Sequence, residues 1–216
     1  MNIRRFLVFY RLPIALVVLA LGFWMGFAVS WWGAVPLFII GLLIIVAHFM
    51  IGPITLIQQY MEAGDVEGAQ KLLDRIKYPN LLYKPVRSSY YMLRANMSGM
   101  SQDLDKAESD LRKGLATGMP EKQFEGSAYL QLGSIALQKG NSKEAFENLS
   151  KAVKLGLPDK DSEAFAYITL CSIAMQRRNF KGAKMYFNKA KNSKATNEQV
   201  LDQIKEMQKY IARMPG

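Results

Sequence analysis

Histidine and cysteine are nearly absent from this chain of 216 residues, which has one of each. A single cysteine excludes an intrachain disulfide, and no Cys/His ligand set for zinc can be assembled. The phosphate-binding pattern Gly-x-x-x-x-Gly-Lys-Ser/Thr is also missing. The pairs Asp103/Asp105 and Asp159/Asp161 lie beside expected helix starts, where the helix dipole accounts for them. We therefore expect no metal site, no cofactor and no enzymatic activity.

Charge is missing from a long stretch near the N-terminus. No acidic residue precedes Glu62, and residues 12–57 contain no Asp, Glu, Lys or Arg. The formal net charge of +10 divides into +3 from three N-terminal arginines and +7 from the remaining 25 basic and 18 acidic residues. A basic surface favours anionic lipid or nucleic acid. Lysine is however interspersed with acidic residues, as on an ordinary solvated surface, so we do not expect nucleic acid as the partner.

The uncharged stretch predicts a transmembrane helical hairpin within residues 1–57. Residues 12–30 and 34–51 are two apolar runs, each close to the ~20 residues that cross the hydrocarbon core. Basic residues flank the hairpin and the turn carries none, which predicts cytoplasmic termini, at the inner or plasma membrane in a bacterium. The outer interface would then hold three aromatic residues, Trp24, Trp31 and Trp32.

Three details of the hairpin leave alternatives open. Ala28-Val-Ser30 also fits a signal-peptide cleavage site, although this apolar run is longer than a signal core and a second run follows. Gly22, Gly26 and Ser30 form a small-residue stripe that suits packing within the hairpin or dimerisation. His48 lies near the inner end of the second run, where it has a functional role or simply contacts headgroups and water.

The rest of the chain repeats itself every 38 residues. Ala107, Ala145 and Ala183 keep this step, as do Tyr91, Tyr129 and Tyr167. A fixed period of this size is typical of stacked helical hairpins. Asp or Asn recurs before each second helix as an N-cap, at Asp65, Asp103, Asn141 and Asn179.

Other residues define where the helices of a pair end and cross. Gly64 and Gly140 suit left-handed helix ends, and Pro120 and Pro158 separate one pair from the next and favour the first turn of the following helix. Small residues are expected where paired helices cross, and we predict that Cys171 is one of these buried residues. The small residues expected at these crossings are Gly133, Cys171, Ala145 and Ala183.

The pattern Tyr129-x-x-Leu132-Gly133, followed by Ala145-x-x-x-Leu149-x-x-Ala152 and Pro158, resembles the tetratricopeptide repeat (TPR). The resemblance covers about residues 82–192 and implies an all-α fold. Its period is longer than the usual ~34 residues, and Ala136 and Ala174 replace the second aromatic residue. Residues 58–216 would form a TPR-like α-solenoid of about 3.5 to 4 helix pairs.

Both ends of the expected solenoid have particular features. The first repeat would take residues 53–63, the continuation of the second membrane span, as its first helix, with a kink at Gly52-Pro53. Residues 197–213 are more polar and predict a C-terminal capping helix.

The resemblance implies that the first helix of each pair lines a groove for a protein or peptide. An apolar stripe there runs beside a row of small polar residues, which suits an amphipathic segment. The alternative is that Met92, Leu130 and Ile168 pack between repeats. The expected groove residues are Met92, Asn96, Leu130, Ser134, Leu137, Phe165, Ile168, Ser172 and Met175.

These features predict a membrane-anchored scaffold that binds a partner protein or peptide at the cytoplasmic face of the lipid bilayer. One alternative is a structural subunit or assembly factor of a larger membrane protein complex. Another is an accessory protein that binds anionic lipid or nucleic acid through its +7 surface.

Overall fold

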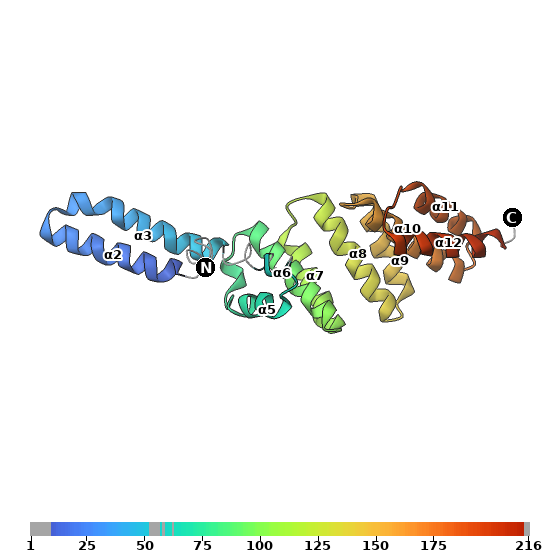
Figure 1. Ribbon diagram of the computed structural model, residues 1–216, viewed down its shortest axis with the longest axis horizontal. Helices are drawn as coiled ribbons and strands as arrows, with labels where there is room; N and C mark the ends of the chain where they lie inside the picture. Colours follow the sequence, from blue (N-terminus) through green and yellow to red (C-terminus); the bar gives the residue numbers. More distant parts are fainter. Residues whose placement is uncertain (1–9, 52–56, 58, 62, 214–216) are drawn as a thin grey trace. The chain divides into compact units, whose positions relative to one another are not determined.

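The computed structural model describes residues 10–51, 57, 59–61 and 63–213. Within these residues every element is helical, so the predicted all-helical class is confirmed. The chain forms two compact units, Met1–Ser101 and Gln102–Gly216. Helices α2, α3, α5, η1 and α6 belong to the first unit, and α7 to α12 belong to the second (Figure 1). A separate domain ending at residue 57 stays a prediction.

An antiparallel hairpin begins the first unit. Helix α2 (Arg11–Ala28) and helix α3 (Trp31–Ile51) lie side by side (Figure 1). The turn is only Val29-Ser30, because Trp31 already belongs to α3 and packs against α2. Its ring makes an edge contact with Phe27 at a centroid distance of 5.1 Å. Residues 31–33, which separate the two predicted apolar runs, therefore belong to α3 and not to the turn, so the predicted position of the turn was wrong.

Small residues bring the two hairpin helices together. Ala15 and Ala34 are fully buried. A Cβ added at Gly22 would lie 3.3 Å from Leu37 Cβ, and one at Gly26 would lie 3.0 Å from the Trp31 ring. Ser30 is exposed in the turn and does not continue this stripe, which corrects its place in the prediction. Gly22 and Gly26 thus face α3 within the hairpin.

The rest of the first unit has its own core. Helices α5 (Val66–Asp74) and α6 (Lys84–Met100) are joined through the short 3₁₀-helix η1 (Pro79–Leu81). Leu72 and Leu73 pack with Tyr90 and Tyr91 in this core. Helix α5 confirms the predicted second helix of the first repeat. Its partner was predicted at residues 53–63, of which 57 and 59–61 are helical, and the Gly52-Pro53 kink lies outside the described residues.

In its described residues, 102–213, the second unit is a stack of six helices. Each helix contacts the next along the chain from α7 to α12, and α12 also contacts α10 (Figure 1). The predicted capping helix is α12, with Asn197 as its N-cap. In chain order the helices are α7 (Leu104–Thr117), α8 (Lys122–Gln138), α9 (Ser142–Leu155), α10 (Lys160–Gln176), α11 (Phe180–Asn192) and α12 (Glu198–Ala212).

Helix caps follow the period as predicted. Each of the four Asp or Asn N-caps accepts the backbone N–H three residues ahead, for example Asp65 Oδ1 from Gly68 at 2.8 Å and Asn179 Oδ1 from Gly182 at 2.9 Å. The residue before each cap has a left-handed backbone. This residue is glycine at Gly64 and Gly140, with φ of 75° and 76°, but the equivalent Gln102 and Arg178 adopt φ of 59° and 56°.

Two prolines lie slightly outside their predicted positions. Pro120 and Pro158 each precede the N-cap residue of the following helix, so they belong to the connection and not to the first helical turn. Their restricted φ still helps to end the preceding segment.

The seam between α8 and α9 depends on Gly133, as predicted. A Cβ there would lie 2.6 Å from Leu149 Cγ and 3.4 Å from the carbonyl oxygen of Ala145. Cys171 is the equivalent residue one repeat later and is fully buried in the core with Ala183. Burial raises the pKa of the Cys171 thiol to about 11, so it is an unreactive core residue.

We expect Gly133→Val to lower the free energy of unfolding by about 1–3 kcal/mol, because the added side chain forces Leu149 and the α9 backbone apart. Gly99→Ala is the matched control. An added Cβ at Gly99 meets nothing within 4 Å, and Gly99 lies in the last turn of α6, so alanine there is expected to be neutral or slightly stabilising. Thermal unfolding followed by circular dichroism checks both, and equal midpoints for the two variants would contradict the packing argument.

An ion-pair network joins α7 to the following helix pair. Lys139 Nζ lies 2.6 Å from Glu108 Oε2, and Arg112 Nη2 lies 2.8 Å from Glu108 Oε1 and 2.5 Å from Glu144 Oε1. Hydrogen bonds from Lys139 and then Arg112 lower the pKa of the Glu108 carboxyl below its ordinary value of 4.5. One repeat later, Arg177 takes the place of Lys139 and donates to the Ser142 carbonyl oxygen at 3.0 Å.

The lowered pKa of Glu108 predicts a pH-dependent effect of Glu108→Gln. The ionised carboxylate stabilises the fold above its unfolded-state pKa, and this contribution is lost as the pH falls through the lower folded-state pKa. At pH 7 we expect the variant to melt roughly 1–4 °C below the unchanged chain. Below about pH 4 the gap should close. Calorimetry across this range is the measurement, and a gap independent of pH would contradict the assignment.

Candidate functional site

The predicted groove residues lie on the first helix of each pair. Met92 and Asn96 are half-buried on α6 in the first unit. The others belong to the second unit, on α8 and α10. These are Leu130, Ser134 and Leu137 on α8, with Phe165, Ile168, Ser172 and Met175 on α10.

Most of the apolar members support packing between helices. Ile168 is only 7% exposed and belongs to the core that α10 and α11 share with Ile204 of α12. Leu130 and Leu137 pack against the core formed by α8, α9 and α10. Met175 packs against the same core as Ile168. Ile168 is therefore unavailable to a partner while α12 is in place, which corrects its inclusion in the groove.

Ser134, Phe165 and Ser172 are the predicted groove residues of the second unit that remain half-buried outside these cores. The Ser134 hydroxyl donates to the Leu130 carbonyl oxygen at 3.1 Å. Thr169 on α10 likewise donates to the Phe165 carbonyl oxygen at 2.8 Å. Because these hydroxyl protons are engaged within the helix, the oxygens are left to accept hydrogen bonds from a ligand.

Helix α12 is tied to α10 through Asp161. Asp161 Oδ1 accepts the backbone N–H groups of Thr196 and Asn197 at 2.7 and 2.9 Å. These hydrogen bonds lower the pKa of the Asp161 carboxyl. The Asp159/Asp161 pair is thus accounted for by structure, since Asp159 Oδ1 accepts the N–H of Ser162 at 2.7 Å as an N-cap. Asp161 holds the capping helix over Ile168.

A second surface was missed by the sequence reasoning. A shallow hollow of about 350 Å³ lies between the start of α8 and the end of α9. Tyr129 and Leu155 supply its apolar lining, and Lys151 Nζ lies 5.2 Å from the centre of the Tyr129 ring. The polar lining consists of Lys122, Glu125, Lys151 and Lys154.

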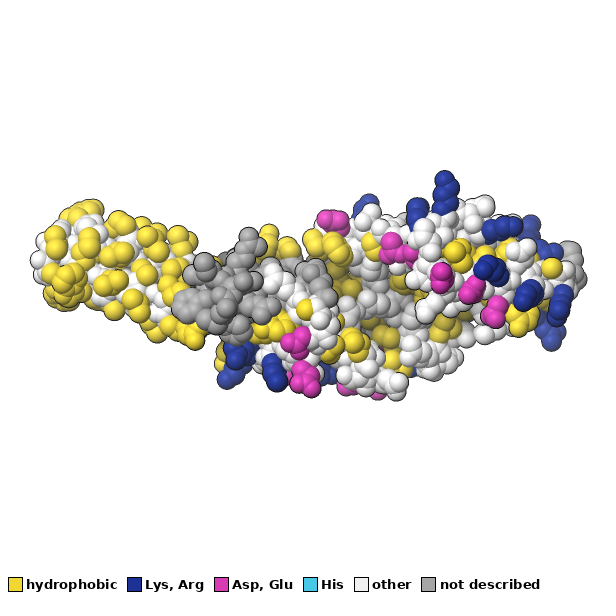
Figure 2. All heavy atoms as spheres, viewed as in Figure 1, with side chains coloured by type: hydrophobic (Ala, Val, Ile, Leu, Met, Phe, Trp, Pro, Cys, Tyr) yellow, Lys and Arg dark blue, Asp and Glu magenta, His cyan; other side chains and the backbone are white. Residues whose placement is uncertain are grey.

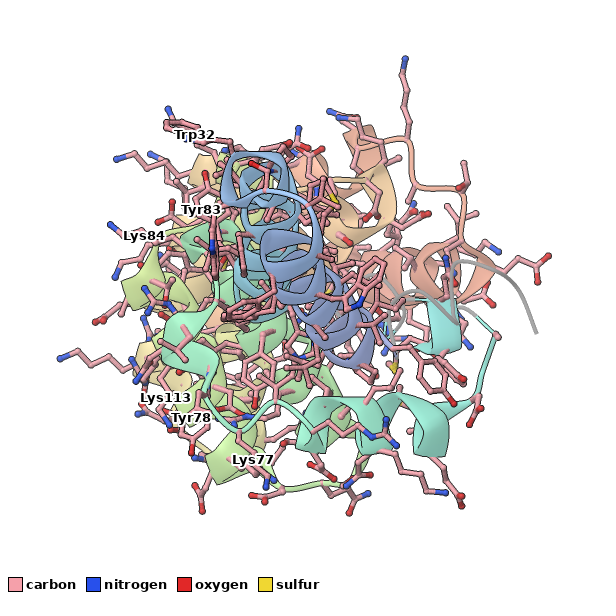
Figure 3. All side chains as sticks on the ribbon, turned by 90° about the vertical axis from the view of Figure 1, so that its left-hand side faces the viewer. Trp32, Lys77, Tyr78, Tyr83, Lys84 and Lys113 are labelled. Carbon is pink, nitrogen blue, oxygen red and sulfur yellow. The ribbon has the colours of Figure 1, made fainter. Side chains whose placement is uncertain are left out.

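The 38-residue period contained the signal for this hollow. Lysine recurs at positions 84, 122 and 160, beside the recurring tyrosines that had been noted. A basic residue also recurs at positions 75, 113, 151 and 189. The side chains of Lys84 and Lys113, labelled in Figure 3, each extend outward from their helix. The recurring lysines and tyrosines together predict a repeated basic and aromatic surface.

The hairpin presents a different surface. Leu16, Phe27 and Leu43 are 63%, 79% and 61% exposed, and the face of the hairpin seen in Figure 2 is covered by hydrophobic side chains. Trp32 near the turn is 89% exposed and extends outward (Figure 3). By length and apolarity, one helix in the described residues could cross a membrane, at Trp31–His48, and Leu12–Ala28 is a shorter apolar helix.

No cluster of three or more potential metal ligands occurs among the described residues. His48 is half-buried in the last turn of α3. The absence of enzymatic activity stays a prediction.

Solved structures that resemble this fold include YrrB and Cut9-Hcn1. YrrB, described as a TPR protein with an unusual peptide-binding site, matches with a TM-score of 0.53 at 15% identity over 73% of this chain and 75% of its own. The APC/C hetero-tetramer Cut9-Hcn1 matches with a TM-score of 0.58 at 11% identity over 88% of this chain, which spans only 35% of the matched chain. These likenesses show a TPR-like fold.

No family model matches the chain, and no curated protein sequence matches it.

Proposed function

We propose that this chain is a membrane-anchored scaffold whose TPR-like helices bind a partner protein or peptide at the cytoplasmic face. The proposal rests on one observation: the chain combines a helical hairpin whose apolar side chains are exposed with a TPR-like stack of helices. The partner class agrees with the peptide-binding site for which YrrB is described.

The dimensions and chemistry of the hairpin support anchoring. At 1.5 Å per residue, the 18 residues of α2 and the 21 residues of α3 correspond to about 27 and 32 Å, close to the ~30 Å hydrocarbon core. Helices satisfy their backbone polar groups internally, as hydrocarbon requires. Exposed Leu16, Phe27 and Leu43 are unfavourable in water and favourable among lipid chains.

Charge supports the proposed orientation. Arg4, Arg5 and Arg11 precede the first span, and Lys71, Arg75 and Lys77 follow the second. The connecting turn has no charge, which favours translocation of the turn and retention of both termini in the cytoplasm.

Cysteine labelling tests the orientation. In a Cys171→Ala background, we expect Ser30→Cys in the turn to react with a membrane-impermeant maleimide in intact cells. Asn192→Cys on α11 should react only after lysis, because it lies on the cytoplasmic side. Both positions are exposed, so accessibility within the protein does not limit labelling. The opposite pattern, or loss of the N-terminal segment from the mature chain, would contradict the proposed anchor.

The half-buried row of Ser134 on α8 with Phe165 and Ser172 on α10 supports partner binding. Its oxygens can accept N–H groups from an extended segment, and Phe165 offers apolar contact. Bulky arginines at Ser134 and Ser172 would obstruct such a segment.

We expect Ser134→Arg/Ser172→Arg to reduce partner recovery at least about tenfold after crosslinking in cells and mild detergent extraction, which corresponds to about 1.4 kcal/mol. Asn188→Arg/Gln203→Arg is the matched control, since it adds the same charge at exposed positions of α11 and α12. Quantitative mass spectrometry measures recovery, and circular dichroism verifies folding. Equal recovery from both variants would contradict binding through this row.

A further inference from the structure

We infer that the hollow between α8 and α9 binds a carboxylate-rich, extended segment of a partner protein. Tyr129 and Glu125 lie on a different face of α8 from Ser134, because they differ from it in helical phase. The hollow is thus a second contact surface, separate from the half-buried row of Ser134, Phe165 and Ser172. This inference rests on the proposed scaffold function and specifies the chemistry of the partner.

Unpaired positive charge is the first observation. Lys122, Lys151 and Lys154 are all exposed around the hollow. In the described part of the chain none of the three has a carboxylate within ion-pairing distance, whereas Lys139 and Arg112 elsewhere in this unit contact carboxylates directly. With Glu125 the hollow carries a net charge of +2 (three lysines and one glutamate), which attracts an anionic ligand.

An aromatic surface between the lysines is the second observation. The Lys151 ammonium lies 5.2 Å from the centre of the Tyr129 ring, within the range of a cation–π interaction. This contact restricts where the ammonium lies. Tyr129 and Leu155 also provide apolar surface for the methylene groups that carry a glutamate carboxylate.

The same arrangement recurs one repeat later in a weaker form. Lys189 Nζ lies 5.4 Å from the centre of the Tyr167 ring, in correspondence with Lys151 and Tyr129. Lys160 takes the place of Lys122 but pairs with Glu163 at 2.9 Å, which neutralises part of this charge. The α8–α9 hollow is therefore the stronger of the two binding positions.

The mixed lining favours a peptide over a polyanion. Glu125 in the hollow and Glu163 in the equivalent position would repel the closely spaced phosphates of nucleic acid or an anionic bilayer. A peptide with spaced carboxylates can avoid these glutamates, and its backbone N–H groups can donate to them.

The test uses the full chain in non-ionic detergent and a fluorescein-labelled peptide in which Glu alternates with Ala. At low ionic strength we expect saturable binding by fluorescence polarisation, weakened by added salt. The same peptide with Gln in place of Glu should not bind. Lys151→Glu/Lys154→Glu should weaken binding at least about tenfold and should instead bind a Lys-Ala peptide, because the charge of the hollow is reversed.

Lys181→Glu/Lys191→Glu is the matched control, since it makes the same charge change at exposed positions of α11. We expect it to leave binding of the acidic peptide unchanged. Equal weakening by both variants would overturn the inference, as would tighter binding of RNA or phosphatidylserine vesicles through Lys151 and Lys154.

Two readouts separate this inference from the scaffold function. If the partner is recovered from cells by the unchanged chain but the acidic peptide fails to bind, the hollow assignment is wrong and the scaffold stands. If Glu-Ala peptide binding follows the predicted pattern but no partner is recovered, the scaffold function fails.

Discussion

The close approach of paired helices is the constraint on which the second unit depends. At Gly133 a single added carbon would meet the Leu149 side chain, and Ala145 and Leu149 are themselves fully buried. Cys171 and Ala183 repeat this arrangement in the next pair. Close packing of each pair fixes the position of its first helix. The row of Ser134, Phe165 and Ser172 lies on these first helices, and the hollow between α8 and α9 is lined by one first helix and its partner.

Two kinds of electrostatic surface coexist in this unit. Around Glu108 opposite charges meet and join α7 to the following pair. Around Tyr129 the lysines Lys122, Lys151 and Lys154 lack such partners in the described residues. The difference follows from position, because Glu108 lies between two cations, whereas Lys151 rests against an aromatic ring.

The sequence predicted the structure best where residues recur at the 38-residue period. The four N-caps and the buried Cys171 follow from the 38-residue spacing between repeats, which the chain shows directly, and the capping helix α12 follows from the greater polarity of its residues. Ile168 was misplaced because its burial depends on Ile204, which contacts it from outside the repeat. The hairpin turn was misplaced because aromatic packing between Phe27 and Trp31 lies outside the rules for turn residues.

The position of α12 has a consequence for assembly. Its inner face, with Ile204, occupies the place where the first helix of another pair would otherwise stack on α10 and α11. Glu198, Asp202 and Lys209 are exposed on the same helix, so the next helix of a neighbouring copy would meet charge instead of an apolar stripe. Stacking of a neighbouring copy head-to-tail on α12 is thereby disfavoured.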